Sequence, residues 1–285
     1  MTQILRTKEL VQNIKQSIRE EASMFEAQGI KPALGIVRVG NRPDDIAYEN
    51  SIIKNCESVN MKVCVFKADP DISMDEFKNL IKRVNEDESI HGILMFRPLP
   101  KHLDYHVIKH LINPAKDIDC SNPINLAKVF EGNGEVFYPS TPEAVVEILK
   151  HFNVPLEGRN VVIINRSVVV GKPLAMMLLK ENATVTICNS KTRNLSDITS
   201  HADVVVCAVA KARLFDAEYF QKDSVVIDVG INQDSDGKLC GDVDFDKVCN
   251  KVHSITPVPG GVGSVTTALL LKHVIKACRS ISFNS

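Results

Sequence analysis

The chain of 285 residues has no tryptophan, and its aromatic residues amount to only 5%. No apolar run approaches the roughly 18 residues of a membrane-spanning helix, and the opening MTQILRTKEL lacks the apolar core of a signal peptide. The eight cysteines are scattered without a Cys-x-x-Cys pair, so we expect reduced thiols and no metal site. The net charge of −1 gives no electrostatic basis for binding nucleic acid or a membrane surface. These absences favour a cytoplasmic protein without nucleic-acid or membrane partners.

What is present is an ordinary globular composition, 44% apolar and 24% charged, long enough for one large domain or two ordinary ones. The pattern over residues 160–192 is the most informative. An apolar β-branched run over 161–164 is typical of a strand buried on both faces, and a polar turn follows it. Gly171 then leads into an apolar helix over 174–180, and a second strand is predicted over 183–188. This is a βαβ unit with a right-handed crossover, and the turn before its helix suits a phosphate.

The cofactor preference depends on charges near that turn. The turn is not Gly-x-Gly-x-x-Gly, and the second strand ends without the acidic residue that holds an NAD ribose. Arg166 and Lys191 instead bring positive charge there, which favours the 2′-phosphate of NADP. An ordinary βαβ unit with solvated loop charges is the alternative.

The first hundred residues predict alternating helices and strands. The elements are a helix over 3–29, a strand over 33–39, a helix from Asp44, a strand over 62–66, a helix over 73–85 and a strand over 90–96. Ser73 fits an N-cap because Glu76 stands three residues later. This order predicts a three-layer α/β domain.

The later sequence predicts a second α/β domain. A loop-rich passage over 114–142 precedes a helix over 143–151, and further apolar strands are expected over 204–208 and 225–229. The Gly-rich loop 256–263 leads into a terminal helix over 265–280 that is expected to pack on the first domain. We therefore predict domains at 1–142 and 143–285.

Several segments are similar to one family, the bifunctional methylenetetrahydrofolate dehydrogenase/cyclohydrolases known as FolD. In chain order they are Gly40-x-x-Pro43, Tyr48, Gly92-Ile-Leu94, Pro98-Leu-Pro100, Lys116-Asp-Ile-Asp119, Thr141-Pro142, Arg166-Ser167-x-x-x-Gly171-Lys-Pro173, Ala183-Thr-Val-Thr186, Ser190-Lys-Thr192, Ile227-Asp-Val-Gly-Ile-Asn232, Gly241-Asp-Val243 and Thr256-Pro-Val-Pro-Gly-Gly-Val-Gly263. They span nearly the whole chain.

The resemblance implies an N-terminal three-layer folate domain and a C-terminal Rossmann-like parallel-sheet domain with a cleft between them. It implies a homodimer that oxidises 5,10-methylenetetrahydrofolate with NADP and hydrolyses the methenyl product to 10-formyltetrahydrofolate, with no metal. It makes Tyr48 and Asp119 the catalytic and folate-binding residues. The other residues that it implies are Pro257, Gly260 and Gly261 for the folate, and Asn165, Arg166, Ser167, Ser190 and Ile231 for the cofactor.

The sequence departs from the family at the position of the catalytic lysine. The family has Tyr-x-x-x-Lys on the first-domain helix, where this chain has Ile52 four residues after Tyr48. Lys54 is six residues after Tyr48 and lies about 120° away from it around a helix, so it cannot simply replace that lysine. The family's glutamine before Pro98-Leu-Pro100 is Phe96. Further departures are Cys120, Ser121, Asn122, Ser140, Asn165, Asn189, Ser264 and Val265.

These losses affect the two reactions differently. Hydride transfer needs mainly two carbons held at contact distance. Methenyl hydrolysis needs proton transfer in the site, which a lysine can supply and Ile52 cannot. We therefore expect a dehydrogenase with weak or absent cyclohydrolase activity. The alternatives are the full bifunctional enzyme and a folate- or nucleotide-binding protein that no longer catalyses.

Overall fold

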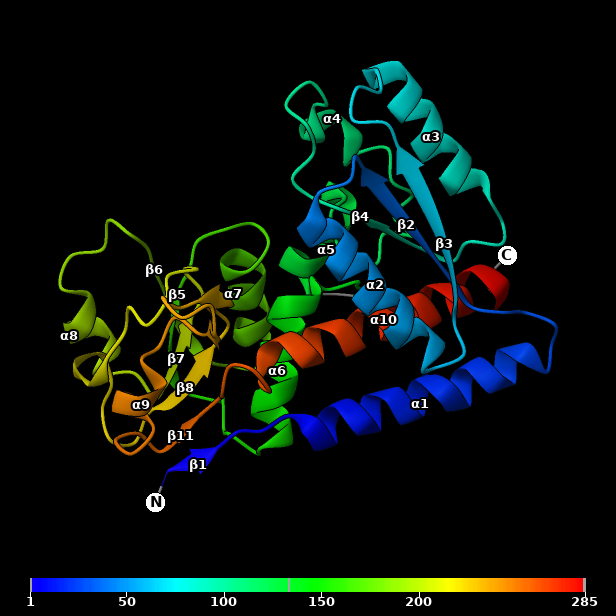
Figure 1. Cartoon of the computed structure of the whole chain (residues 1–285). Coiled ribbons are helices and arrows are strands. Elements are labelled where there is room, and N and C mark those ends of the chain that lie inside the picture. The colour runs from blue at the N-terminus through cyan, green and yellow to red at the C-terminus, as the bar shows by residue number, and fades with distance from the viewer. Residues whose placement is uncertain (1, 133, 284–285) are drawn as a thin grey trace. The chain divides into compact units, whose positions relative to one another are not determined.

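The computed structural model describes residues 2–132 and 134–283, which form two compact units (Figure 1). Unit 1 is built from the chain up to Gln12 and from Pro139 to Thr266. Unit 2 runs from Asn13 to Tyr138 and takes in the chain from Thr267 onward. The chain thus passes between units within the predicted loop-rich passage, but its first residues belong with unit 1 because they pair with a strand there.

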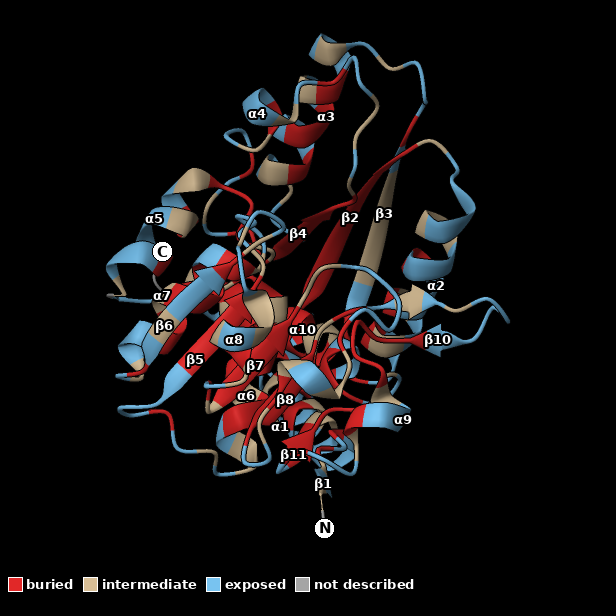
Figure 2. Ribbon diagram, turned by 90° about the vertical axis from the view of Figure 1, so that its left-hand side faces the viewer, coloured by how far each residue is buried: buried red, intermediate tan, exposed pale blue. Residues whose placement is uncertain are grey.

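Unit 1 contains a six-stranded parallel sheet in the order β1-β11-β8-β7-β5-β6. The strands are β1 (Gln3–Ile4), β5 (Asn160–Ile164), β6 (Thr184–Cys188), β7 (Val204–Cys207), β8 (Val225–Asp228) and β11 (Ser254–Ile255). The valine- and isoleucine-rich central strands β7 and β8 are buried along their whole length, as Figure 2 shows in red. A parallel sheet covered on both faces requires such strands.

Helices and short elements complete unit 1. They are α6 (Ser140–His151), α7 (Gly171–Lys180), α8 (Leu195–Thr199), the 3₁₀ turn η1 (Ala217–Tyr219), β9 (Asn232–Gln233), β10 (Leu239–Cys240) and α9 (Phe245–Val248). The predicted βαβ unit is confirmed as β5-α7-β6, although α7 begins at Gly171, three residues earlier than predicted. A Cβ at Gly171 would collide with the backbone carbonyl of Asn165, so glycine allows this early start.

Unit 2 contains a three-stranded parallel sheet in the order β3-β2-β4. Its strands are β2 (Ala33–Val39), β3 (Lys62–Ala68) and β4 (Gly92–Met95), and its crossover helices are α2 (Pro43–Glu57) and α3 (Met74–Glu86). Val37 on β2 and Ile93 on β4 pack in one core cluster with Phe77 of α3. Arg38 points to the other face, where it pairs with Glu49 of α2. The predicted three-layer arrangement is confirmed, as is the Ser73 capping box of α3.

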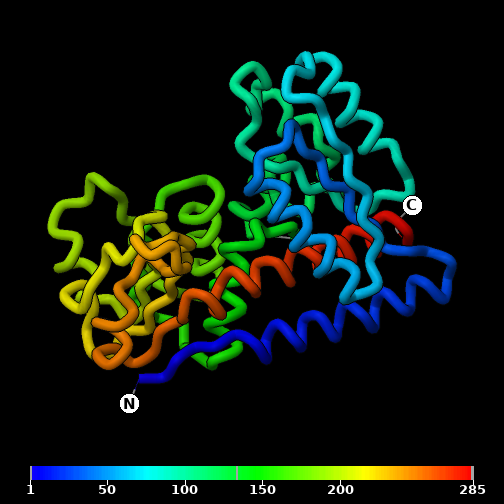
Figure 3. The backbone as a smooth tube through the Cα atoms, viewed as in Figure 1, coloured from blue at the N-terminus to red at the C-terminus, as the bar shows by residue number. Residues whose placement is uncertain are grey.

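Four more helices contribute to unit 2: α1 (Lys8–Glu26), α4 (Tyr105–Ile108), α5 (Pro123–Glu131) and α10 (Val262–Phe283). The ends of α1 and α10 lie side by side, with the rings of Phe25 and Phe283 5.7 Å apart and Glu21 paired with Arg279 (Figure 3). None of the helices in the described ranges has the length and apolarity needed to cross a membrane.

One prediction about these elements was wrong. Residues 3–29 do not form one helix, because Gln3 and Ile4 pair with β11 and α1 ends at Glu26. The loop-rich passage 114–142 also contains α5, which starts with Asn122 as N-cap and Pro123.

Candidate functional site

The Lys116-Asp-Ile-Asp119 segment holds one side of the candidate site in unit 2. The Lys116 ammonium donates to the carbonyls of Asn85 and Asp87, 2.8 Å away in each case, and so binds the end of α3. Asp117 is buried and accepts two backbone N–H bonds at the start of α5 together with one from the Asn125 amide. The first two charged residues of the segment are therefore structural, and they fix where Asp119 lies.

Asp119 is the charged residue of this segment that does not hold the backbone, so its carboxylate can bind a ligand. Its Oδ2 accepts a hydrogen bond of 2.8 Å from Arg97 Nη2. The preceding carbonyl, that of Ile118, accepts one of 2.8 Å from His273 Nδ1 on α10. Burial raises the pKa of the Asp119 carboxyl, and the Arg97 charge lowers it. The sequence predicted Asp119 as a catalytic and folate-binding residue but gave Arg97 no role.

Tyr48 and Phe96 form an aromatic pair close to these charges. Their ring centroids are 5.3 Å apart, with Tyr48 45% exposed and Phe96 buried. Burial of the phenol and the nearby Asp119 charge raise the pKa of Tyr48 to about 12. The hydroxyl therefore stays protonated at neutral pH, so it can donate a hydrogen bond but not act as a base.

The lysine position of the family lies on the buried side of α2. Ile52, one turn after Tyr48, has no exposed surface, whereas Lys54 is exposed. An exposed Lys54 agrees with its predicted angular distance from Tyr48. The Arg38–Glu49 pair, 2.7 Å between Nε and Oε2, ties this helix to the end of β2. Ile52 thus belongs to the core beneath the site.

A second group of predicted residues lies at the carboxyl ends of β5 and β7 in unit 1. Asn165 Nδ2 donates 2.6 Å to the carbonyl of Ala208, which links the ends of the two strands. Its Oδ1 accepts from the backbone N–H groups of Ser167 and Gly171, at 2.8 and 3.0 Å. The Asn165 side chain therefore holds the turn together at the start of α7.

Arg166, Ser167, Ser190 and Lys191 are all exposed around this turn. The register pairs Ile164 with Cys188, so β5 and β6 end level and their following residues lie at one edge of the sheet. Among the described residues, none forms an ion pair with Arg166 or Lys191. These two cations are consequently available to an anionic ligand.

The remaining predicted residues line one cavity of about 210 Å³ in unit 1. Ile231, to which the resemblance assigns a cofactor contact, lines it together with Pro257, Gly260 and Gly261, to which it assigns folate contacts. Other lining residues are Asp228, Val229, Gly230, Leu239, Val258, Pro259, Val262, Gly263 and Ser264. Ile231 is 63% exposed, so this wall offers an apolar surface to a ligand.

Buried polar groups shape this cavity. The Asp228 carboxylate accepts backbone N–H bonds from Gly230, Asp242 and Val243, at 2.9 to 3.0 Å. The Asp228 N–H donates to Thr256 Oγ1 at 2.8 Å, which joins β8 to the Gly-rich loop. Burial raises the pKa of Asp228 to about 7, against the opposite effect of its N–H donors. We assign Asp228 a structural role.

Thr7 is a residue of this region that sequence reasoning missed. It is fully buried, and its hydroxyl lies 3.1 and 3.0 Å from the carbonyls of Gly260 and Gly261 and 3.0 Å from Ser264 Oγ. It therefore supports the Gly-rich loop from a point more than 250 residues away in sequence. No local sequence pattern signals such a contact.

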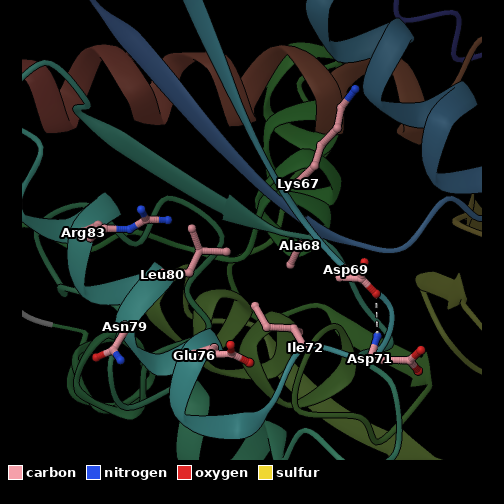
Figure 4. Close-up of a pocket in the computed structure, with 9 residues that line it drawn as sticks. All are labelled: Lys67, Ala68, Asp69, Asp71, Ile72, Glu76, Asn79, Leu80 and Arg83. Atoms are coloured by element: carbon pink, nitrogen blue, oxygen red, sulfur yellow. Dashed lines mark hydrogen bonds between the residues drawn. The ribbon is translucent and has the colours of Figure 1, made fainter.

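A wider hollow of about 650 Å³ in unit 2 lies elsewhere, between the end of β3 and α3 (Figure 4). Two of its three acids already hold local backbone, since Asp69 accepts from the Asp71 N–H and Glu76 belongs to the capping box of Ser73. None of the predicted site residues lines it. Its size therefore does not make it the candidate site.

The grouping of possible metal ligands and the state of the cysteines can be described for these ranges. Within residues 2–132 and 134–283, no three His, Cys, Asp or Glu side chains are grouped as a metal site requires. All eight cysteines are free. Burial raises the pKa of the Cys120 thiol beside Asp119, so it stays protonated.

Comparisons with known proteins agree with this geometry. The family model "Tetrahydrofolate dehydrogenase/cyclohydrolase, catalytic domain" matches residues 5–119, and the family's "NAD(P)-binding domain" matches residues 139–282. "Bifunctional protein FolD 1" of Desulfitobacterium hafniense is 55% identical over 280 residues, covering 98% of this chain and 100% of that protein.

Solved structures are also similar over nearly the whole chain. The bifunctional FolD enzyme of Campylobacter jejuni has a TM-score of 0.96 at 38% identity, covering 98% of this chain and 99% of that one. The FolD of Trypanosoma brucei, in complex with NADP and an inhibitor, has a TM-score of 0.92 at 31% identity, with 99% of each chain covered.

Proposed function

Because this chain belongs to the tetrahydrofolate dehydrogenase/cyclohydrolase family, we propose that it oxidises 5,10-methylenetetrahydrofolate to the methenyl form with NADP and has little or no cyclohydrolase activity. Carbon 11 of the folate loses a hydride to the nicotinamide, and the nitrogen lone pair stabilises the resulting cation. The protein's task in this step is to hold the two carbons together.

Unit 2 supplies the folate-binding groups in this proposal. Asp119 accepts hydrogen bonds from the pterin, and its one free oxygen is consistent with that role. Tyr48 is partly exposed beside it and can contact the ligand's rings or donate from its hydroxyl. Pro257, Gly260 and Gly261, in unit 1, contribute further folate contacts.

Unit 1 supplies the cofactor-binding groups. Arg166 and Lys191 bind the 2′-phosphate of NADP through charge-assisted hydrogen bonds, with Ser167 and Ser190 nearby. Ile231 contacts the nicotinamide. Asn165 acts mainly by fixing the turn, because its carboxamide already makes three hydrogen bonds.

The single observation behind the weak cyclohydrolase is the burial of Ile52. A residue with no exposed surface and no polar atom cannot move a proton to or from water in the site. Phe96, whose ring contacts that of Tyr48 at a tilt of 35°, replaces the glutamine of the family with another apolar group. Lys54 is exposed on a different side of the helix.

The names of the relatives favour a second candidate, the full bifunctional enzyme. An assay of both half-reactions on the purified protein separates the two. Methenyltetrahydrofolate hydrolysis at the buffer rate, with active NADP-dependent oxidation, supports the proposal. Hydrolysis well above the buffer rate establishes the bifunctional enzyme, and no absorbance change with either nicotinamide cofactor establishes a binding protein.

A homodimer in the cytoplasm completes the proposal. The homodimer is implied by the family resemblance, and the cytoplasmic location by the scattered cysteines and the lack of a signal-peptide core. Sedimentation of the purified protein and fractionation of its cells test them.

A further inference from the structure

The Arg97 guanidinium lies where a ligand of Asp119 has to bind. It donates 2.8 Å to Asp119 Oδ2, and its carbon lies 5.6 Å from the centroid of the Tyr105 ring. The Arg97 and Asp119 side chains remain 29% and 23% exposed. Tyr105 thus supports the Arg97–Asp119 ion pair on one side, and the exposed part of both side chains leaves another side accessible to a ligand.

Hydrogen-bonding capacity remains on both partners. Within the described ranges, no residue donates to Asp119 Oδ1. Arg97 has five N–H donors, of which one is used on Asp119 and one points to the Tyr105 hydroxyl at 3.4 Å. The pair therefore presents a free acceptor beside free donors.

That pattern is complementary to one edge of a 2-amino-4-oxopteridine. The edge carries an amino group, the N3–H and the C4 carbonyl in a row, which is donor, donor and acceptor. Asp119 Oδ1 can accept from N3–H, and an Arg97 N–H can then donate to the adjacent O4. A carboxylate alone offers nothing to O4, whereas an Arg–carboxylate pair satisfies both positions.

We propose that Arg97 is a substrate-binding residue that recognises the C4 oxygen of the pterin through a charge-assisted hydrogen bond, with Asp119 reading the neighbouring N3–H. This inference rests on the proposed function, because it assumes that Asp119 faces a folate. It makes Arg97 a determinant of specificity for 4-oxopteridines over 4-aminopteridines, whose C4 group is a donor that faces the Arg97 donors.

The experiment compares dissociation constants for two ligands with the same tail, folic acid and its 4-amino counterpart, in the unaltered protein and in Arg97→Met. The unaltered protein is expected to prefer the 4-oxo ligand. Arg97→Met should reduce that preference roughly tenfold or more, the effect of losing one charge-assisted hydrogen bond. Arg97→Lys, which keeps a charged donor, should retain part of it.

The ratio of the two constants is independent of the fraction of folded protein. Arg42→Met serves as the matched control, because Arg42 is an exposed arginine paired with Asp45 and contacts only the backbone of Arg97. It should leave the ratio unchanged.

An Arg97→Met variant that weakens both ligands equally would overturn the inference and leave the proposed function standing, since Arg97 would then only support Asp119. An unaltered protein that binds neither ligand would overturn the proposed function and this inference together.

Discussion

Two residues apart on α2, Ile52 is completely buried and Lys54 is exposed. Lys54 and Ile52 therefore lie on different sides of α2, with the ammonium group in solvent and the isoleucine side chain in the core. General acid–base help is typically worth about 10²–10⁴-fold. Under the proposed function, the location of this cation is therefore expected to decide which of the two folate reactions the protein assists.

The first prediction is that methenyltetrahydrofolate accumulates. With methylenetetrahydrofolate and NADP⁺, the unaltered protein should form the methenyl product, whose further hydrolysis should stay near the spontaneous rate. The absorbance of the methenyl form, followed with and without protein, measures this directly. Rapid conversion to the formyl form would reject the role given to Ile52.

Placing a lysine at position 52 should destabilise the protein. Ile52→Lys buries an ammonium where no surface is exposed, so it should reduce the free energy of unfolding by on the order of 3 kcal/mol. Ser51→Lys, at an exposed position of the same helix, is the control and should change it little. Ile52→Lys alone should not restore hydrolysis, because Phe96 leaves the ammonium without a polar partner. We expect the double variant Ile52→Lys with Phe96→Gln to hydrolyse methenyltetrahydrofolate faster than Ile52→Lys alone.

The second prediction concerns NADP. Arg166→Ala should weaken NADP binding by about tenfold or more, because a charge-assisted hydrogen bond to the 2′-phosphate is lost. NAD binding should change little. Lys180→Ala removes an equal charge at the far end of α7 and should affect neither cofactor. Equal losses for NADP and NAD in Arg166→Ala would show that Arg166 does not contact the 2′-phosphate.

The third prediction separates two acids in one segment. Asp119→Ala should lower kcat/KM for methylenetetrahydrofolate by on the order of 100-fold through the lost hydrogen bonds to the pterin, with a change in stability of about 1 kcal/mol or less. Asp117→Ala should instead cost about 3 kcal/mol of stability, because it leaves two buried backbone N–H groups unpaired and removes one hydrogen bond of the Asn125 amide. Normal folate kinetics in Asp119→Ala would make Asp119 a simple loop residue.

The fourth prediction concerns pH. The charged groups near Asp119 are Arg97, Asp117 and His273. Burial raises the Asp119 pKa and Arg97 lowers it, so removing the cation must raise it further. In the proposed function the ionised carboxylate binds the pterin, so activity should be lost as pH falls through this pKa. The acid limb of kcat/KM, which reports the free enzyme, should therefore lie at higher pH in Arg97→Met than in the unaltered protein. An unmoved limb would show that Asp119 does not control it.

The fifth prediction tests the support of the Gly-rich loop. Thr7→Val keeps the shape of the side chain but removes the hydroxyl that contacts Gly260, Gly261 and Ser264. It should cost about 1 kcal/mol of stability and raise the KM for methylenetetrahydrofolate. Thr2→Val is the control, since Thr2 bonds only the Val252 carbonyl, outside the cavity. A KM unchanged by Thr7→Val would show that the loop does not depend on this contact.

Local sequence patterns predicted those parts of the fold that depend on local chemistry. The β-branched runs of β5, β7 and β8 indicated buried parallel strands, and Ser73 with Glu76 marked the start of α3. The turn between β5 and α7, to which the cofactor contacts were assigned, was located in the same way, because its residues follow a strand directly.

Features that depend on distant partners could not be predicted. Gln3 pairs with Ser254 at the edge of a sheet. The helical spacing of apolar residues continues through Gln3, so the local pattern alone could not show that this residue belongs to a strand. Arg97 stands in a short proline-rich stretch, and only the fold brings it to Asp119. The Asn122-Pro123 start of α5 was a local signal that was present and overlooked.

The pairing of β1 with β11 has a consequence for how the protein is made. Gln3 is synthesised on the order of 10–50 s before Ser254 at usual rates of translation, and during that time β1 has no partner strand. Phe25 likewise precedes Phe283, the residue of α10 on which its ring stacks, by most of the described chain. Each unit therefore receives the partner of one of its early segments late in synthesis. A chain cut before Ser254 would leave β1 unpaired.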